Sequence, residues 1–249
     1  MISAPPPDFF SLCRLDAIDS TNDEAKRRAA ANAPEGLIIL ADRQTAGRGR
    51  QGRVWQSPPG NLYCSILLRP DRALGEVAQL GFAASLAVAE ALAPLLPPPL
   101  TPRCKWPNDV LIEGRKIAGI LLESEAAGGR AAWLVIGIGI NIASHPADAE
   151  TRTTSLVDLG APPIAPDELL ARFRARFLPW YESWRERGFA PLRAAWLERA
   201  EGIGGQIRVR EARGERRGRF VDLDATGALV LENNEGRQHI SAGAVFPAG

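Results

Sequence analysis

Residues 105–142 read KWPNDVLIEGRKIAGILLESEAAGGRAAWLVIGIGINI, and they carry the strongest strand pattern of the chain. It contains short apolar runs at residues 110–112, 117–123 and 133–142, which predict three consecutive strands. The first two strands are joined by a tight turn around Gly114. We therefore expect these strands to form an antiparallel meander.

The flanking segments alternate between helical and strand patterns. A hydroxyl at Thr21 followed by an acid at Glu24 predicts the start of a helix that runs to about residue 33. The other predicted elements are strands at residues 37–41 and 61–69, a long buried helix at 74–96, and helices at 167–187 and 191–200. Prolines 97–99 should end the helix at 74–96, and Pro179 should kink or split the helix at 167–187. The pattern predicts a domain of mixed α and β structure.

The texture of the sequence changes after Gln206. Short alternating segments separated by glycine-containing turns are typical of a small β-barrel or sandwich. We place the boundary near residues 202–205, which gives a first domain at 1–202 and a second at 203–249. The arginines of residues 208–219 are interrupted by Glu211 and Glu215, and they predict a solvated strand face rather than a nucleic-acid patch.

Composition excludes several classes of function. The chain has 249 residues, 45% hydrophobic and 24% charged, with 30 Lys+Arg against 29 Asp+Glu, so no overall field favours nucleic acid or an anionic membrane. Its 3 cysteines form no C-x-x-C pair, and 2 histidines argue against a zinc site or a histidine-based triad. The first residues lack a leader pattern, and we expect no apolar run of the roughly 18 residues that a membrane span needs. The expected location is the cytoplasm.

The segment from Gly47 to Arg53 alternates glycine with arginine. Glycine lets backbone amides approach an anion closely, and guanidinium groups neutralise it, so the segment predicts a phosphate-binding loop. Composition alone would equally suit a solvated linker or an RNA-binding tail. Trp55 and the apolar strand that follows place the loop inside a folded domain, where an aromatic side chain suits a nucleotide.

Asp109 and Lys116 flank the turn around Gly114. Either register of a two-residue turn puts both side chains on the same face of the hairpin, because cross-strand partners share a side. A carboxylate that holds Mg²⁺ beside a lysine that neutralises a phosphoryl oxygen is a common arrangement for ATP chemistry. The alternative is an ion pair on a solvated face.

In the strand at 136–142 four isoleucines occupy one face, while Gly137, Gly139 and Asn141 occupy the other. Glycine weakens a strand, so two on one side indicate that something approaches the backbone there. A ligand and a tightly packed neighbouring helix are both compatible with this pattern. The strand follows the hairpin and could complete the same pocket.

Several motifs occur together in one order: DSTN at 19–22, Gln44, GRGRQGRVW at 47–55, KWPND at 105–109, RKIAG at 115–119 and GIGIN at 137–141. Across about half of the chain they resemble those of biotin protein ligases. The resemblance implies an α+β fold, a mixed or antiparallel sheet flanked by helices as in biotin and lipoyl ligases, followed by a small SH3-like β-barrel. It also implies that the biotin carboxylate attacks the α-phosphate of ATP, and that a lysine of a biotin carboxyl carrier domain then accepts biotin from biotinyl-AMP.

The resemblance further implies roles for individual residues. Lys116 would be the central catalytic cation between the biotin carboxylate and the α-phosphate, with Arg48 and Arg50 as further catalytic cations and Asp109 holding Mg²⁺. The biotin site would comprise Ser20, Thr21, Asn22, Gln44, Arg48, Gly49, Arg50, Lys116 and Gly119. The ATP site would comprise Arg53, Trp55, Lys105, Asn108 and Asn141. In this scheme the segment around Gly49 closes over biotin and the adenylate.

Two departures from the family pattern limit these expectations. Some members carry a winged-helix DNA-binding domain, but nineteen residues precede Ser20, so we expect no DNA binding by that route. The family pattern places an arginine shortly after Ser241, where this chain has Ala242-Gly243, which leaves open whether the terminal barrel binds ATP. Two rival functions are a lipoate ligase, which lacks the GRGRxGRxW loop, and a non-catalytic biotin sensor. The oligomeric state is also open, with a homodimer as one alternative.

Overall fold

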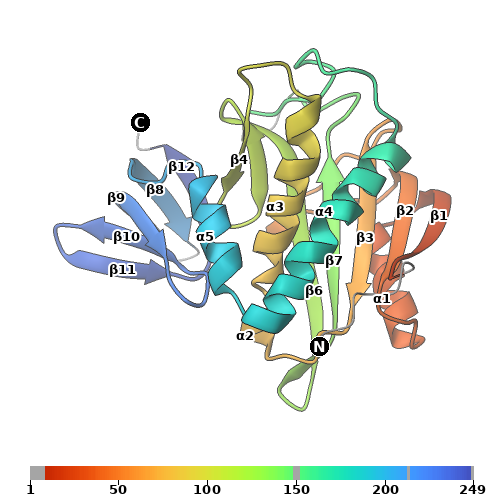
Figure 1. Ribbon diagram of the computed structural model, residues 1–249, viewed down its shortest axis with the longest axis horizontal. Helices are drawn as coiled ribbons and strands as arrows, with labels where there is room; N and C mark the ends of the chain where they lie inside the picture. The colour runs from red at the N-terminus through yellow and green to blue at the C-terminus, as the bar shows by residue number, and fades with distance from the viewer. Residues whose placement is uncertain (1–8, 148–151, 212–213, 248–249) are drawn as a thin grey trace.

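The computed structural model describes residues 9–147, 152–211 and 214–247. It contains a seven-stranded sheet with helices on both faces, and a five-stranded sheet beside it (Figure 1). Residues 1–8, where no leader is expected, lie outside the described part of the chain.

The larger sheet has the order β1-β2-β3-β7-β6-β5-β4. Its strands are β1 (Ser11–Ile18), β2 (Leu37–Gln44), β3 (Leu62–Leu68), β4 (Pro102–Lys105), β5 (Asp109–Ile112), β6 (Arg115–Ala127) and β7 (Arg130–Ile140). Strands β1 and β2 are parallel, and every other pair of neighbours is antiparallel. The predicted meander β5-β6-β7 and the mixed sheet are therefore confirmed.

The sequence did not predict β1 and β4, the two outer strands. Most of β1 is exposed or half-buried, and β4 is only four residues long. An edge strand pairs on one side only and tolerates polar residues and a leading proline such as Pro102. Neither strand therefore carries the apolar pattern that identifies inner strands.

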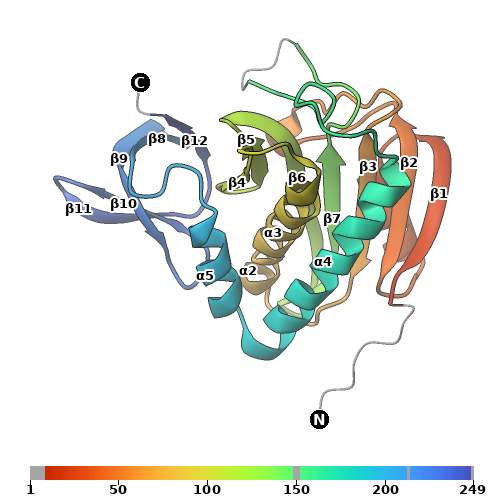
Figure 2. The ribbon, with the colours of Figure 1, turned by 45° about the horizontal axis from the view of Figure 1, so that its top comes forward.

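Helices cover the two faces of this sheet unequally (Figures 1 and 2). One face is covered by α3 (Leu80–Leu92) and α4 (Pro166–Arg187), which enclose the main core. On the other face α1 (Thr21–Ala30) packs Ala25 and Ala29 against the sheet in a smaller core. Because α1 is short, part of this face is left to the loops and to the site described below.

The helix predicted at residues 74–96 is divided into α2 (Leu74–Val77), α3 and the 3₁₀ turn η2 (Ala93–Leu95). The expectation that no segment reaches membrane-span length is wrong, because Leu74–Leu95 is long and apolar enough by composition. However, 78% of its most apolar window is buried within the protein. The apolar composition therefore reflects a core helix packed between the sheet and α4.

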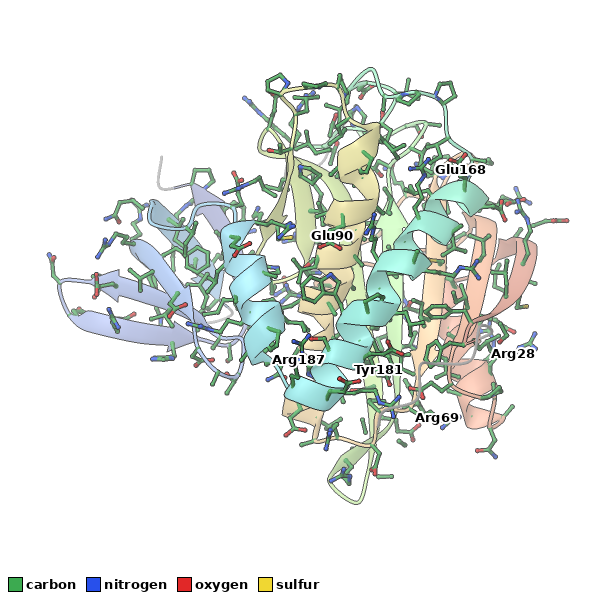
Figure 3. All side chains as sticks on the ribbon, in the orientation of Figure 1. Arg28, Arg69, Glu90, Glu168, Tyr181 and Arg187 are labelled. Carbon is green, nitrogen blue, oxygen red and sulfur yellow. The ribbon has the colours of Figure 1, made fainter. Side chains whose placement is uncertain are left out.

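Pro179 does not split the helix in which it lies, so that alternative of the sequence prediction is wrong, and α4 is continuous. The rings of Phe173, Phe177, Tyr181 and Trp184 stack in succession along its buried face, on both sides of the proline. Tyr181 also donates a hydrogen bond to Glu35, and it is labelled on α4 in Figure 3. This packing offsets the hydrogen bond that proline removes.

The second predicted helix is present as α5 (Ala190–Glu198).

The second sheet is SH3-like and antiparallel, with the order β11-β10-β9-β8-β12. Its strands are β8 (Gln206–Glu211), β9 (Gly214–Leu223), β10 (Leu229–Asn233), β11 (Gly236–Ile240) and β12 (Ala244–Pro247). Trp106 of the KWPND motif donates its indole N–H to the Gly227 carbonyl at 3.0 Å, and Arg193 of α5 donates to the Leu223 carbonyl at 2.6 Å. These contacts hold the second sheet beside β4 and bring β12 to the edge of the first domain.

Candidate active site

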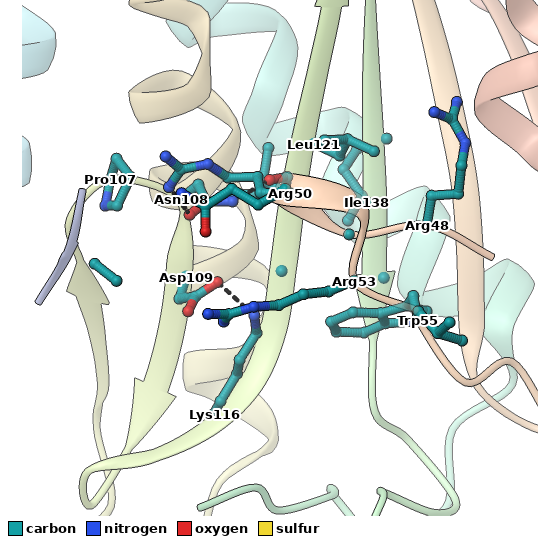
Figure 4. A pocket seen from close by; sticks show the side chains of 18 of the residues that line it. Arg48, Arg50, Arg53, Trp55, Pro107, Asn108, Asp109, Lys116, Leu121 and Ile138 are labelled. Atoms are coloured by element: carbon teal, nitrogen blue, oxygen red, sulfur yellow. Dashed lines mark hydrogen bonds and ion pairs between the residues drawn. The ribbon is translucent and has the colours of Figure 1, made fainter. Parts of the chain in front are cut away.

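A pocket of about 330 Å³ opens on the face of the large sheet that α1 leaves uncovered (Figure 4). The glycine- and arginine-rich loop covers it, and β12 closes one side. Every site residue predicted from the sequence lines this one pocket: Ser20, Thr21, Asn22, Gln44, Arg48, Gly49, Arg50, Arg53, Trp55, Lys105, Asn108, Asp109, Lys116, Gly119 and Asn141. The predicted elements therefore share a single surface.

One end of the pocket is neutral and densely hydrogen-bonded. The backbone N–H of Thr21 donates to Gln44 Oε1 at 2.8 Å, with the Thr21 hydroxyl oxygen 3.1 Å from the same atom, and Gln44 Nε2 donates to the Ser57 hydroxyl at 2.9 Å. The Ser65 hydroxyl lies 2.8 Å from Thr21 Oγ1 and 2.6 Å from Asn22 Oδ1. This end offers fixed donors and acceptors without net charge.

Sequence reasoning missed Ser57 and Ser65, which hold these side chains in place. Ser65 is fully buried, and it is the one serine or threonine in LYCSILL of β3. A single polar residue in a buried strand requires a partner, so Ser65 could have been found from this signal. Ser57 lies in a loop and carries no comparable pattern.

The loop over the pocket forms a small hairpin. Gly49 N–H donates to the Arg53 carbonyl at 2.7 Å, and Trp55 N–H donates to the Gly47 carbonyl at 2.9 Å. Its tip is the 3₁₀ turn η1 (Arg50–Gly52). The loop is therefore built into the folded domain, as predicted, and is not an unstructured linker.

The three arginines of the loop have different surroundings. Arg48 Nη2 contacts Asp23 Oδ1 at 2.7 Å and Glu123 Oε2 at 2.8 Å, on the side of α1. Arg50 Nη1 donates to Asn108 Oδ1 at 3.0 Å. Burial lowers the pKa of Arg50, while the charge of Asp109 opposes this shift. Arg53 extends towards Asp109 and Lys116 (Figure 4). The loop thus places positive charge along the pocket.

Lys116 and Asp109 form an ion pair of 2.6 Å between Nζ and Oδ1. The turn lies at Glu113-Gly114, Leu111 pairs with Lys116, and a bulge then places Asp109 opposite Gly119. The prediction that both side chains share one face is confirmed. Their side chains are only 21% and 19% exposed, so the alternative of a pair on a solvated face is wrong.

The glycine face of β7 is filled by two side chains of the protein itself. A Cβ at Gly139 would lie 2.5 Å from the Trp55 ring, and one at Gly137 would lie 2.1 Å from Asn22 Oδ1. Asn22 belongs to α1 and Trp55 to the loop, so close packing explains the glycines, and both side chains also line the pocket. Lys116 Nζ lies 5.3 Å from the centre of the Trp55 ring, where a cation is favoured.

The segment after β7 completes the wall next to Lys116. Lys116 N–H donates to the Arg152 carbonyl at 2.8 Å, and Thr154 N–H donates to the Lys116 carbonyl at 3.0 Å. Asn141 Nδ2 donates to the Thr154 carbonyl at 3.0 Å. Sequence reasoning missed this segment, because it contains no motif and is brought to Lys116 only by the fold.

The terminal sheet also reaches the pocket, a point that the sequence left open. Phe246 of β12 lines it, with Lys105 Nζ 5.4 Å from the ring centre and the guanidinium carbons of Arg208 and Arg210 at 5.1 and 4.8 Å. Arg210 is exposed and Arg208 is half-buried, in keeping with the predicted solvated face, and both also contact the Phe246 ring. Burial lowers the pKa of Lys105, Asp109 raises it, and Lys116 lowers it further.

Metal-binding capacity at this pocket is limited. Within the described residues, no group of three or more His, Cys, Asp or Glu side chains could hold a metal ion. In the part of the chain that the structure describes, Asp109 is the one acidic residue that lines the pocket. Mg²⁺ commonly binds through one or two carboxylates together with substrate phosphates and water, so this donor set fits Mg²⁺ only in company with a polyphosphate.

The fold and this site correspond to a known class of ligase. Residues 15–141 match the biotin/lipoate A/B protein ligase family, and residues 202–246 match the biotin protein ligase C-terminal domain. The chain is 40% identical to the biotin--[acetyl-CoA-carboxylase] ligase of Paracoccus denitrificans, over 94% of this chain and 100% of that protein. It is 37% identical to the bifunctional ligase/repressor BirA of Bacillus subtilis, over 90% of this chain and 70% of that protein.

A solved structure shows the same architecture. The biotin protein ligase from Aquifex aeolicus in complex with biotin and ATP superposes with a TM-score of 0.79 and 30% identity, covering 94% of this chain and 97% of that one. Both parts of the chain, their order and nearly their whole length are therefore shared. This protein belongs to the biotin protein ligase family.

Proposed function

We propose that this protein condenses biotin with ATP to give biotinyl-AMP and pyrophosphate, and then transfers biotin to a lysine of a biotin carboxyl carrier domain. The observation that carries the proposal is the Lys116–Asp109 pair. It lies in a pocket with a neutral polar end and a cationic loop. Such a pocket suits a ligand with a neutral ring at one end and two anions meeting at the other.

The neutral end would bind the ureido ring of biotin. A urea offers two N–H donors and one carbonyl acceptor, and it carries no charge that a buried site would have to neutralise. Ser20, Thr21, Asn22 and Gln44 supply the matching groups. Gly119, which has no side chain, lets the Trp55 ring and the Lys116 ammonium approach its backbone, because a Cβ there would lie 2.9 Å from the ring and 3.1 Å from Lys116 Nζ.

Lys116 would stabilise the reacting groups. Two anions, the biotin carboxylate and the α-phosphate, must approach each other, and an ammonium between them offsets the charge that accumulates in the transition state. The carboxylate oxygen then forms a bond to phosphorus while the bond to the pyrophosphate leaving group breaks. Arg48 and Arg50 add positive charge from the loop, and Arg53 lies where it can meet the phosphates.

Asp109 would hold Mg²⁺ together with the phosphates of ATP, next to Asn108 and Lys105. The bound ion would neutralise phosphate charge and help the pyrophosphate to leave. The ammonium of Lys116 contacts Asp109 Oδ1, and a metal ion on the carboxylate would weaken this pair. The lysine would then be available to the biotin carboxylate and the α-phosphate.

Trp55 and Asn141 would lie beside the adenine, and the loop around Gly49 would close over the adenylate. Exclusion of water protects a mixed anhydride from hydrolysis.

We assign the adenylating site to a domain of residues 1–202, with residues 203–249 as a second domain whose β12 forms one wall of the pocket. The acceptor lysine would attack the biotinyl carbonyl and release AMP.

The proposal is tested by incubating the protein with ATP, Mg²⁺ and either biotin, lipoate or other short carboxylic acids, and identifying the adenylate by mass spectrometry. Biotinyl-AMP is the expected product. Lipoyl-AMP alone would overturn the choice of substrate. Absence of pyrophosphate release at saturating biotin and ATP would instead support a non-catalytic sensor.

A further inference from the structure

The carboxylate of Glu123, on β6, receives polar contacts from three directions. Lys26 Nζ lies 2.9 Å from Oε1, while Asn22 Nδ2 and Arg48 Nη2 lie 2.9 and 2.8 Å from Oε2. Asp23 joins the group, with its Oδ1 2.7 Å from both Lys26 Nζ and Arg48 Nη2. Two acids and two cations therefore form a balanced network between α1, β6 and the loop over the pocket.

This network is more than a surface ion pair. The Glu123 side chain is 22% exposed, and those of Lys26 and Asp23 are 28% and 30% exposed. Burial alone would raise the pKa of Glu123, but hydrogen bonds from Lys26 and Asn22 and the charge of Arg48 hold it below its ordinary value. Glu123 is consequently ionised at neutral pH, and an ionised carboxylate can only accept hydrogen bonds.

The ionised carboxylate fixes the orientation of Asn22. Because Glu123 accepts only, the amide must present Nδ2 to it, and Oδ1 then faces the Ser65 hydroxyl at 2.6 Å. Asn22 is 3% exposed. If its amide were reversed, Oδ1 would face the Glu123 carboxylate and two buried acceptors would meet without a donor between them. Glu123 thereby sets the direction of the hydrogen bonds at the neutral end of the pocket.

The hydrogen bonds continue from Asn22 back to the loop. With the Ser65 proton directed to Asn22 Oδ1, the Thr21 hydroxyl donates to Ser65, and the Thr21 backbone N–H donates to Gln44 Oε1 at 2.8 Å. Gln44 then donates to Ser57, whose hydroxyl donates to the Trp55 carbonyl at 3.0 Å. Trp55 is the far end of the same hairpin that begins near Arg48, since Arg48 and Val54 form a β-bridge. The loop is thus attached at both ends to one network that passes beneath the neutral end of the pocket.

We infer that Glu123 is a positioning residue. Acting through Asn22 and Arg48, it couples the neutral end of the pocket to closure of the loop at residues 47–55. A ligand that pairs with the neutral groups would tighten the network and, through Glu123, hold Arg48 and the loop in place. The part of this inference that concerns the adenylate rests on the proposed function.

The first test uses the ligand-free protein and hydrogen–deuterium exchange of residues 47–55. Glu123→Gln keeps the size of the side chain and removes its charge, so exchange of the loop amides should rise on the order of tenfold, as expected for loss of a charge-assisted hydrogen bond. Arg48→Ala should also raise exchange, and the double variant should raise it by less than the two single effects combined, because both substitutions remove the Glu123–Arg48 contact while Arg48 also pairs with Asp23. The matched control is Glu125→Gln on the same strand, whose carboxylate accepts from Trp133 Nε1 at 2.9 Å.

Unchanged loop exchange in Glu123→Gln, or additive effects in the double variant, would overturn the inference. The second test measures the lifetime of the enzyme-bound adenylate, which should shorten on the order of tenfold in Glu123→Gln. Faster loop exchange with an unaltered lifetime would overturn the coupling to the reaction. Failure of the wild-type protein to form any adenylate would refute the proposed function, while the exchange experiment would still decide whether Glu123 anchors the loop.

Discussion

Lys116 Nζ lies 2.6 Å from Asp109 Oδ1, across the turn that joins β5 to β6. The two side chains are only about one-fifth exposed, and Lys116 Nζ lies 5.3 Å from the centre of the Trp55 ring. In this position the ammonium can change partners from Asp109 to an incoming anion with little movement of the strands. The first two predictions follow from this relationship.

Lys116→Ala should slow adenylate formation by about 10²- to 10³-fold or more, because preorganised charge at the reacting centre contributes on this scale. Pre-steady-state measurement of pyrophosphate release would show the effect. The control is Arg115→Ala, whose guanidinium lies 3.5 Å from the exposed carboxylate of Glu113. A near-normal rate in Lys116→Ala would remove this lysine from the mechanism.

Asp109→Asn should raise the Mg²⁺ concentration needed for half-maximal adenylation more than it raises the KM for biotin. Among the described residues the substitution removes the one carboxylate that lines the pocket, and an amide is a weaker ligand for a hard cation. Chelation of Mg²⁺ should abolish adenylation by the wild-type protein. Identical Mg²⁺ dependence of variant and wild type would contradict the assigned role.

Arg50→Gly should release the reactive adenylate and label bystander lysines. The substitution removes the hydrogen bond from Arg50 Nη1 to Asn108 Oδ1 and frees the tip of the loop, so the pocket no longer excludes water and competing nucleophiles. Biotin incorporation into an unrelated protein measures the release. Arg217→Gly on the exposed surface of β9 serves as the control. Retained acceptor specificity in Arg50→Gly would argue against a closing role.

Gly139→Ala should raise the KM for ATP and destabilise the protein by roughly 1–3 kcal/mol, the usual cost of overpacking. The new methyl group would lie 2.5 Å from the Trp55 ring and displace it. Gly75→Ala is a matched control, because no atom lies within 4 Å of its added Cβ. Equal thermal stability and equal KM for ATP in the two variants would show that Trp55 does not depend on the bare glycine face.

Asp224→Asn should destabilise the protein at neutral pH and have less effect in acid. Burial would raise the pKa of Asp224, but hydrogen bonds from Thr226, His239 and the Ala228 amide lower it to about 2. A carboxyl group with a depressed pKa stabilises the fold above its ordinary pKa of 3.8, and this contribution is lost as the pH falls through about 2. Chemical denaturation at several pH values should show the gap between wild type and variant closing between these limits. A constant gap down to pH 2 would contradict the prediction.

Much of the architecture could be predicted because inner strands and core helices carry strong local patterns. The meander from β5 to β7 followed from three apolar runs and one glycine turn, and the parity of that hairpin placed Asp109 with Lys116. The same approach failed where local pattern and tertiary packing disagree. Pro179 lies within a continuous helix because stacked aromatic rings outweigh the missing hydrogen bond, and β1 lacks an apolar pattern because it is an edge strand.

The motifs of the sequence identified most of the polar residues that line the pocket, since they concentrate unusual residue types, such as glycine beside arginine or a lone carboxylate before a strand. The fold added the remaining wall of the pocket and showed how the motif residues are held. Glu123, Ser65 and Phe246 come from separate strands and reach the site through packing and hydrogen bonds. Contacts between residues far apart in the chain leave no periodic trace in the sequence, so their partners become visible only when the sheets and the loop are assembled.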